Sequence, residues 1–217
     1  MCGALGDAPC PGCAAGLRRA PALPPPTNVD TCLALLAYEG GGRELVARLK
    51  YRNARSSVPF LARAMADLAA AVGPVDVVTW APTTAARRRG RGFDQAELLA
   101  RPVARRLDVP CRRLLLRPPG KPQTGQALDA RRAGPTFVAI RPAPTRVLLV
   151  DDVVTSGATV AAAARALRTA GATRIHVVAA ARTPRLPWPT AGLHSERVAV
   201  CGSVVESRGQ SQAKRPT

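Results

Sequence analysis

Aromatic side chains are scarce in this sequence. Phe, Trp and Tyr together make up 3% of its 217 residues, whereas hydrophobic residues as a whole make up 47%. A core must therefore be built from Ala, Val and Leu, which favours helices packed on a buried sheet. The scarcity also argues against a base-stacking platform of the kind that binds single-stranded nucleic acid.

Acidic residues are few as well. The chain has 14 Asp and Glu against 32 Lys and Arg, for a formal net charge of +18. Two interpretations stay open. The arginines are spread over the solvated faces of helices, or they form a surface that meets a polyanion, either nucleic acid or a phosphorylated substrate.

Long hydrophobic runs are missing. No segment approaches the roughly 18 apolar residues that a membrane-spanning helix needs, so no transmembrane segment is expected. Met1 is not followed by the basic segment and hydrophobic stretch of a secretory signal. We therefore expect a cytoplasmic protein, whose six cysteines serve as thiols or metal ligands rather than as disulfides.

The chain divides into four zones. Residues 1–20 are rich in Gly and Ala and hold three cysteines, and residues 21–28 form a proline-rich linker. Residues 29–183 alternate apolar runs with amphipathic segments and form the predicted main domain. Residues 184–217 are predicted to be a basic, disordered tail.

Hydrophobic periodicity in the main zone predicts alternating strands and helices. The strands are expected at residues 32–38, 75–80, 147–150 and 174–181, and the helices at 43–51, 58–72, 93–107 and 158–170. Gly171 stands where a glycine is expected after a helix. The alternation predicts an α/β fold with a mostly parallel sheet and helices on both faces.

The most informative segment is residues 146–159. Four apolar residues lead to Asp151 and Asp152, then come Val153 and Val154, a loop of small hydroxyl residues and Gly, and the start of a predicted helix. In a parallel sheet this strand end is where ligands bind. A helix N-terminus with hydroxyl side chains favours a phosphate, whereas the carboxylates favour ribose hydroxyls or a magnesium ion.

Residues 147–159 resemble, at all thirteen positions, the motif with which type I phosphoribosyltransferases bind 5-phosphoribosyl 1-pyrophosphate (PRPP). The resemblance implies that Asp151 and Asp152 are the catalytic acids that hold the ribose hydroxyls. It also implies that the loop holds the 5′-phosphate through Thr155, Ser156, Gly157, Ala158 and Thr159.

Two other classes of protein also contain an apolar strand that ends in adjacent acidic residues. A receiver domain of two-component signalling needs a later phosphoacceptor Asp, and no Asp follows Asp152. A P-loop ATPase needs a Gly-Lys-Ser/Thr sequence upstream, and Lys121, in the one Gly-Lys pair, is followed by Pro122. Both alternatives are excluded.

A basic, glycine-rich stretch follows the predicted strand at residues 75–80. Pro82 opens a tight turn, and residues 87–92 read as a basic loop that could hold a pyrophosphate. The alternatives are that this stretch is the solvent-exposed start of a helix or a surface patch that binds nucleic acid. Lys50 either reaches the phosphates or is an ordinary surface lysine.

Several landmarks occur in one order along the chain: Tyr38, Lys50, Pro82, Arg91-Gly92-Phe93-Asp94-Gln95, Gln123 and Arg132. Together with the acidic motif they resemble the ComF family of competence-associated phosphoribosyltransferase homologues, in which Asn is usual at position 94. The resemblance implies a Rossmann-like type I phosphoribosyltransferase fold and a role in DNA uptake. It also implies substrate contacts by Pro82, Arg91 and Lys50.

Cys10 and Cys13 have the Cys-x-x-Cys spacing of half a zinc knuckle. Cys2 is similar to the end of a second such pair, and ComF proteins often begin with a four-cysteine zinc ribbon. Cys2, Cys10 and Cys13 would then be three of four ligands, so that either the start lies upstream or the site has degenerated. Cys32 is the alternative fourth ligand.

These patterns together predict a PRPP-binding phosphoribosyltransferase that uses Mg²⁺ with PRPP and acts on an acceptor that the sequence does not identify. The alternative is a non-catalytic PRPP-sensing or nucleic-acid-binding accessory protein. Further partners implied are single-stranded DNA or the DNA-uptake machinery. The oligomeric state stays open, and a dimer is compatible with the sequence.

We expect the chain as written to bind Zn²⁺ poorly, because three thiolates leave open the fourth position that structural zinc sites close. A chain extended upstream by a cysteine three positions before Cys2 should bind one ion. Metal analysis of both chains tests this, and stoichiometric zinc in the chain as written would contradict it.

Overall fold

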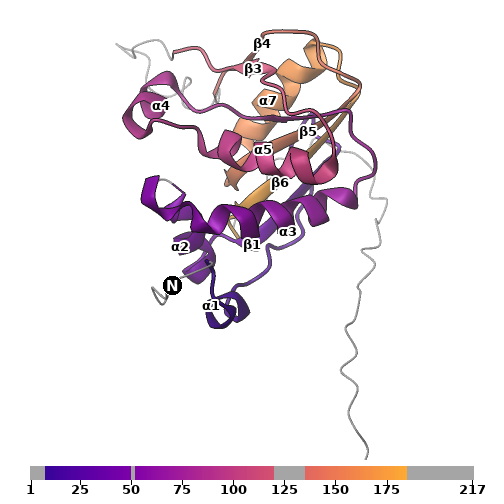
Figure 1. Cartoon of the computed structure of the whole chain (residues 1–217). Helices are drawn as coiled ribbons and strands as arrows, with labels where there is room; N and C mark the ends of the chain where they lie inside the picture. Colours follow the sequence, from indigo (N-terminus) through magenta and orange to yellow (C-terminus); the bar gives the residue numbers. More distant parts are fainter. Residues whose placement is uncertain (1–7, 50–51, 120–134, 185–217) are drawn as a thin grey trace, which may run out of the picture.

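The computed structural model describes residues 8–49, 52–119 and 135–184. Four strands form a parallel sheet in the order β1-β6-β5-β2 (Figure 1). They are β1 (Thr31–Ala37), β2 (Val77–Trp80), β5 (Arg146–Val154) and β6 (Arg174–Arg182). A separate antiparallel pair is formed by β3 (Leu115–Leu116) and β4 (Val138–Ala139).

The helices lie between these strands. They are α1 (Pro11–Ala15), α2 (Gly40–Arg48), α3 (Val58–Ala70), α4 (Ala85–Arg91), α5 (Gln95–Leu107) and α7 (Ala158–Thr169), with a 3₁₀ helix at Arg52–Ser57. All four predicted strands and all four predicted helices are present, with ends that differ by a few residues. Gly171 follows α7 at φ 110°, in the left-handed half of φ space that favours glycine, as predicted.

Two local predictions are corrected. The stretch at residues 87–92 is not a loop, because Ala85–Arg91 forms α4. The Thr84 hydroxyl accepts the Arg87 N–H at the start of this helix, and Gly92 ends it in the left-handed conformation. The strand predicted at 147–150 continues to Val154, because β6 pairs with it as far as Arg182.

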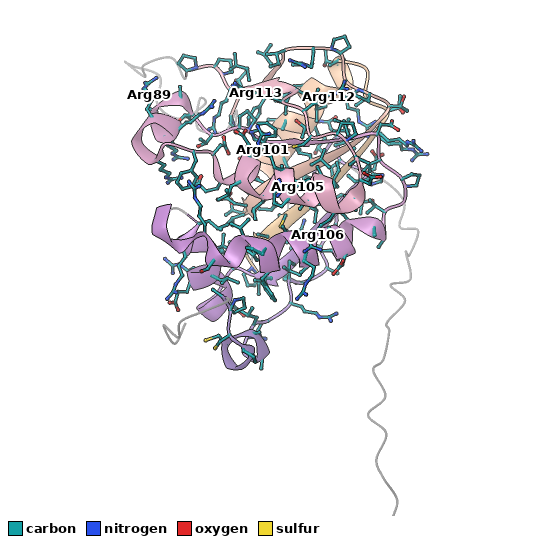
Figure 2. The ribbon with its side chains drawn as sticks, in the orientation of Figure 1. Arg89, Arg101, Arg105, Arg106, Arg112 and Arg113 are labelled. Atoms are coloured by element: carbon teal, nitrogen blue, oxygen red, sulfur yellow. The ribbon has the colours of Figure 1, made fainter. Side chains whose placement is uncertain are left out.

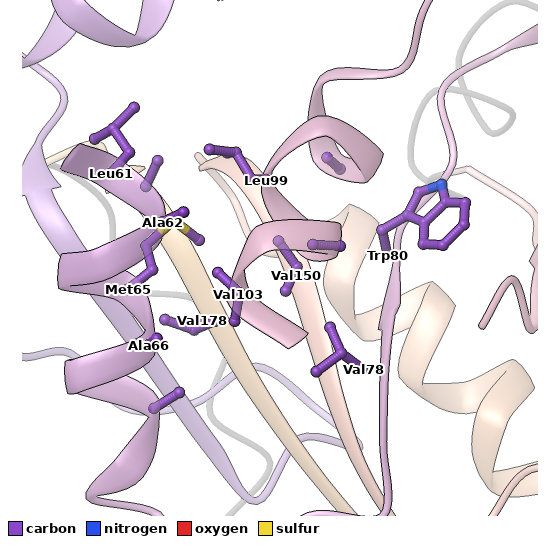
Figure 3. Close-up of a cluster of buried hydrophobic side chains, with 14 of the residues drawn as sticks. Leu61, Ala62, Met65, Ala66, Val78, Trp80, Leu99, Val103, Val150 and Val178 are labelled. Atoms are coloured by element: carbon purple, nitrogen blue, oxygen red, sulfur yellow. The ribbon is translucent and has the colours of Figure 1, made fainter. Parts of the chain in front are cut away.

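The sheet is covered on both faces. On one face α2, α3 and α5 pack against Val78, Val150 and Val178, and Figure 3 shows Leu61 and Met65 of α3 in this cluster. On the other face α7 and the β3–β4 pair cover the alternate residues of the same strands, with Val147 and Val177 among them. Small side chains such as Ala100 and Ala163 are fully buried, as the low aromatic content predicted.

The chain changes direction across the sheet between β2 and β5. The connection from β1 to β2 contains α3, and the connection from β2 to the bridge between Cys111 and Val78 contains α5. Both helices lie on one face of the sheet. It then returns to β5 and β6, and α7 lies on the other face. The loops after β2 and β5 therefore leave toward opposite faces, which is the topology at which a ligand crevice is expected between two strand ends.

The segment before β1 is held against the sheet by backbone hydrogen bonds. The Ala37 N–H donates to the Arg18 carbonyl at 2.9 Å, and the Ala20 N–H donates to the Leu35 carbonyl at 3.2 Å. Over the described ranges, no helix combines the length and the apolar character that crossing a membrane requires.

We expect Gly42→Ala to destabilise the fold, because a Cβ there would collide with the backbone carbonyl of Ala37 at the end of β1. Such an overlap costs about 1–3 kcal/mol, and each kcal/mol lowers the Tm of a chain of this size by about 2–4 °C. Gly90→Ala in α4 is the matched control, since its Cβ meets nothing. It should leave the Tm unchanged or raise it, and an equal loss in both variants would contradict the packing.

Candidate functional site

Asp151 lies within β5, one residue beyond the last pair with β2 and at a point where the pairing with β6 continues. It pairs with Ala179 of β6 and is 6% exposed. Its carboxylate accepts the N–H of Asp152 at 2.9 Å, and the Asp152 carboxylate accepts the N–H of Val153 at 2.8 Å. The sequence had placed both acids at the strand end, outside the core; the structure buries Asp151 because β5 extends beyond it.

Burial holds the pKa of Asp151 well above its usual range, and the neighbouring charge of Asp152 raises it further. The charge of Asp94 also raises the pKa of Asp151. A ligand with donors or with a divalent charge would favour the ionised acids.

Residues 155–157 join β5 to α7 in a short turn. Gly157 stands just before the helix at φ 74°, ψ −6°, a conformation that other residues rarely adopt. Thr155 and Ser156 are exposed, and the Thr183 hydroxyl holds the turn by donating to the Thr155 carbonyl at 3.4 Å.

The N-terminus of α7 has no side-chain cap within the described part of the chain. The Ser156 hydroxyl accepts a long hydrogen bond from the Ala158 N–H at 3.5 Å. The other N–H groups in the first turn of this 12-residue helix and the helix dipole favour an anion at the turn. This is the position at which the sequence predicted a phosphate.

Asp94 organises the other half of the crevice. Its carboxylate accepts the N–H of Thr83 at 2.7 Å, in the turn after β2, and the N–H of Ala96 at 3.1 Å, in the first turn of α5. Asp94 is 5% exposed, and burial raises its pKa despite these donors, with the Glu97 charge adding to the rise. The residue therefore fixes the turn that carries Pro82.

The turn after β2 is joined directly to β5. The Ala81 N–H donates to the Val150 carbonyl at 3.2 Å, so Pro82 follows immediately beside the strand that carries Asp151. Of the sequence-predicted residues, the structure thus brings Pro82 and the acidic motif together.

A pocket opens beside this turn. Arg88, Arg113 and Arg117 line it together with Asp94 and Glu97, and Trp80 is among its apolar walls. The Arg117 guanidinium lies 5.7 Å from the centre of the Phe137 ring. Burial and the nearby charge of Arg87 lower the pKa of Arg117, which places two arginines close together.

Of the three pocket arginines, Arg88 lies in the basic stretch that the sequence predicted could hold a pyrophosphate, whereas Arg113 and Arg117 were not predicted. The three arginines come from α4 and from the segment around β3, which are far apart in the sequence, and only the position of Arg88 in the basic stretch gave any signal. Asp94 differs from the Asn that is usual in the ComF pattern. Its role as the cap of α5 could have been predicted, because an Asp directly before an amphipathic segment is typical of a helix N-terminus.

The structure does not bring the remaining predicted site residues that it describes to the acidic motif. Arg91 is half-buried at the end of α4, where its guanidinium donates to the Gln95 side chain at 3.0 Å. Lys50, Gln123 and Arg132 lie outside the described residues, as does Cys2.

Cys10 and Cys13 lie at the start and inside α1. Cys32 is buried, and its sulfur accepts a hydrogen bond from Arg182 at 2.8 Å. Burial raises the pKa of the Cys32 thiol to about 11, although Arg182 acts against the rise. Within residues 8–49, 52–119 and 135–184, no three His, Cys, Asp or Glu side chains form a group that could hold a metal ion. Cys32 therefore does not join Cys10 and Cys13 as a zinc ligand.

Residues 94–190 match the family of the phosphoribosyl transferase domain. No curated protein matches the sequence. The solved structures include glutamine PRPP amidotransferase from B. subtilis complexed with ADP and GMP, at 26% identity over 62% of this chain and 26% of that one, with a TM-score of 0.41. This chain therefore spans about a quarter of the length of that protein.

Two shorter enzymes are also similar. The purine phosphoribosyltransferase from Pyrococcus horikoshii OT3 matches at 17% identity over 64% of this chain and 93% of its own, with a TM-score of 0.37. Adenine phosphoribosyltransferase from Leishmania tarentolae matches at 13% identity over 70% and 91%, with a TM-score of 0.38. The family match and the observed parallel sheet confirm the predicted α/β fold of the phosphoribosyltransferase type.

We expect Asp151→Asn to raise the stability of the folded chain increasingly as pH rises. An unfolded Asp ionises near pH 3.9, whereas the folded Asp151 keeps its proton to higher pH. Between these two pKa values the unfolded state binds fewer protons, so the wild type loses stability with rising pH. Asn avoids this cost and can still accept the Asp152 N–H.

Thermal unfolding of both proteins from about pH 4 to pH 8 measures the effect. The Tm difference should be small at the acid end and grow to a few degrees at the neutral end. Asp67→Asn, on the exposed side of α3, is the control for the loss of one carboxylate, and its Tm difference at the neutral end should be smaller than that of Asp151→Asn. A constant difference for Asp151→Asn would refute the argument.

Proposed function

We propose that the phosphoribosyltransferase domain of this chain binds PRPP in the crevice between the ends of β2 and β5 and transfers its phosphoribosyl group to a nucleophilic acceptor. The observation that carries the proposal is one continuous segment. An acid pair on β5, buried Asp151 and half-buried Asp152, is followed three residues later by a glycine turn and the N-terminus of α7. Acids for hydroxyls and N–H groups for a phosphate thus lie at adjacent points of one crevice.

The 5′-phosphate would lie in the turn before α7. Thr155, Ser156 and Thr159 carry hydroxyls there, and Gly157 and Ala158 leave room for the backbone to approach the anion. The positive φ of Gly157 turns the chain so that the first N–H groups of the helix converge on one point.

The ribose hydroxyls would donate to Asp151 and Asp152. Two adjacent carboxylates, of which Asp152 raises the pKa of Asp151, are also a fitting partner for a divalent cation. These two residues would hold Mg²⁺, which when bound offsets the charge of the pyrophosphate.

The pyrophosphate would lie toward the turn after β2. Pro82 shapes this turn and Asp94 fixes it, while the Arg88, Arg113 and Arg117 guanidinium groups surround the neighbouring pocket. Positive charge develops at the anomeric carbon as pyrophosphate leaves, and fixed guanidinium groups stabilise the leaving anion. Arg91 and Lys50 stay candidates for the same role on the strength of the sequence pattern alone.

The wider role follows from the sequence resemblance. The ordered landmarks of the ComF pattern support a protein that serves DNA uptake in the cytoplasm. They also support an N-terminal segment, residues 1–20, derived from a zinc ribbon, and a main domain at residues 29–183. The acceptor would be a nitrogen or another nucleophile.

The test is calorimetric titration of Mg²⁺ and PRPP into four proteins. Gly157→Val should weaken PRPP binding at least about 10-fold, equal to ~1.4 kcal/mol, because a β-branched residue resists a positive φ and blocks the phosphate. Ala158→Ser is the matched control and should bind like the wild type. The double variant Asp151→Ala, Asp152→Ala should lose binding while it keeps its fold.

Equal affinities for Gly157→Val and Ala158→Ser would show that the turn does not surround a phosphate. Turnover is measured separately, as pyrophosphate release with a panel of amine and nucleobase acceptors. Release that depends on an acceptor supports a transferase. Tight binding without release from any acceptor would instead support a PRPP-sensing protein.

A further inference from the structure

Five arginines gather on the outer side of α5 and on the segment that follows it. Figure 2 shows Arg101, Arg105 and Arg106 along the helix and Arg112 and Arg113 on the neighbouring segment. We call these five residues the arginine face. Arg101, Arg105, Arg106 and Arg112 are exposed, and Arg113 is half-buried and also lines the pocket beside Pro82.

The packing of α5 explains why the three helical arginines share a side. The helix buries Ala96, Leu99, Ala100, Val103 and Ala104 against the sheet and α3. Positions 101, 105 and 106 fall on the remaining side of a 3.6-residue turn.

The chain then reverses and brings two further arginines alongside. Asp108 ends the helix in the left-handed conformation, and the Val109 N–H donates back to the Ala104 carbonyl at 3.1 Å. The Arg112 N–H donates to the Val78 carbonyl at 3.0 Å. Cys111 packs against the cluster of buried residues to which Val103 and Ala104 of α5 belong, so this segment lies beside the helix, as Figure 2 shows.

The arginine face has too few acids to neutralise it. Glu97 pairs with Arg101 at 2.6 Å, and Asp108 is the other carboxylate on this stretch. In the described ranges no ion pair involves Arg105, Arg106 or Arg112, whereas Arg48 and Arg168 elsewhere each pair with an acid. Like charges at i and i+4 destabilise a helix, so the arrangement favours a counter-charge from outside the molecule.

We propose that the arginine face binds the phosphate backbone of nucleic acid. Guanidinium groups pair with phosphates in a bidentate manner. Arg101 and Arg105 are one helical turn apart, about 6 Å along the axis, and the face extends beyond them in both directions. A single small phosphate cannot span it, but a chain of closely spaced phosphates can.

The chemistry of the face favours nucleic acid over a lipid surface. The exposed large hydrophobic residues of the described chain are Leu116, Val138 and Ile140, which lie on or beside β3 and β4 rather than on α5. A helix that inserts into a bilayer needs such residues beside its cations. The face also has no aromatic side chain for base stacking, so we infer binding that depends on phosphates and not on base sequence.

The experiment compares two triple variants of the full chain by fluorescence anisotropy with labelled single-stranded and duplex DNA over a series of salt concentrations. Arg105→Ala, Arg106→Ala, Arg112→Ala removes three cations of the face. Arg141→Ala, Arg165→Ala, Arg174→Ala removes three exposed arginines elsewhere, one of them on α7, and changes the net charge equally. Thermal unfolding and PRPP binding of each variant check that the fold is intact.

The first triple should bind DNA at least about 10-fold more weakly, and its slope of log K against log salt should be smaller by about 2–3, as expected for three lost phosphate contacts. The control triple should lose no more than about threefold, since only long-range charge is removed. The single variant Arg112→Gln, which disturbs packing least, should reduce the slope by about 1.

Binding to either form of DNA with this pattern supports the proposal, and the two probes show which form is preferred. Equal losses in both triples would overturn it, because the effect would then follow net charge alone. No DNA binding by the wild type at about 0.1 M salt, where a site with several phosphate contacts still binds, or binding only to anionic vesicles, would also overturn it. Loss of PRPP binding in the glycine-turn variants would leave this result unaffected, so the two proposals fail separately.

Discussion

The pairing of β5 on both of its edges is the constraint on which the candidate site depends. Val150 pairs with Trp80 of β2 on one side and with Val178 of β6 on the other. Since both edges are paired and helices cover both faces, the strand delivers Asp151 into a buried position between two neighbours. The same pairing places the turn after β2 next to the acid, through the hydrogen bond from Ala81 to Val150.

Two buried acids are costly for the fold. Burial raises the pKa values of Asp94 and Asp151. Asp94 is compensated by two backbone N–H groups that it holds in place. Among the described residues, the N–H groups that donate to Asp151 and Asp152 belong to their immediate neighbours, so both acids retain capacity for ribose hydroxyls and a cation. Sites that act on ligands commonly sacrifice stability in this way.

The unequal distribution of arginines has a similar physical origin. The chain carries far more cations than acids, and several of the acids are used in pairs away from α5, such as Glu44 with Arg48 and Asp30 with Arg168. The side of α5 that faces away from the core is left with cations that repel each other. Where such charge lies beside a pocket lined by further arginines, the whole region attracts phosphates.

The strands and long helices were predictable because their signal is local. Short apolar runs identified the strands β1, β2, β5 and β6. A 3.6-residue periodicity of apolar residues identified the helices α2, α3, α5 and α7. The helix α4 was missed because its seven residues, Ala85–Arg91, include four arginines and no buried residue, so that periodicity had nothing to detect. Its two ends were nevertheless encoded, by Thr84 as cap and by Gly92 in the left-handed conformation.

The sequence by itself determined the acidic motif, the glycine turn and the order of strands and helices along the chain, since each depends on residues a few positions apart. The tertiary structure alone decided that Asp94 holds the turn beside β5, that Arg113 and Arg117 share a pocket with Arg88, and that Arg112 returns alongside α5. These residues are brought together by the strand order β1-β6-β5-β2 and by the faces that the crossovers take. Strand order is set by the burial of the whole core, which no local pattern of residues records.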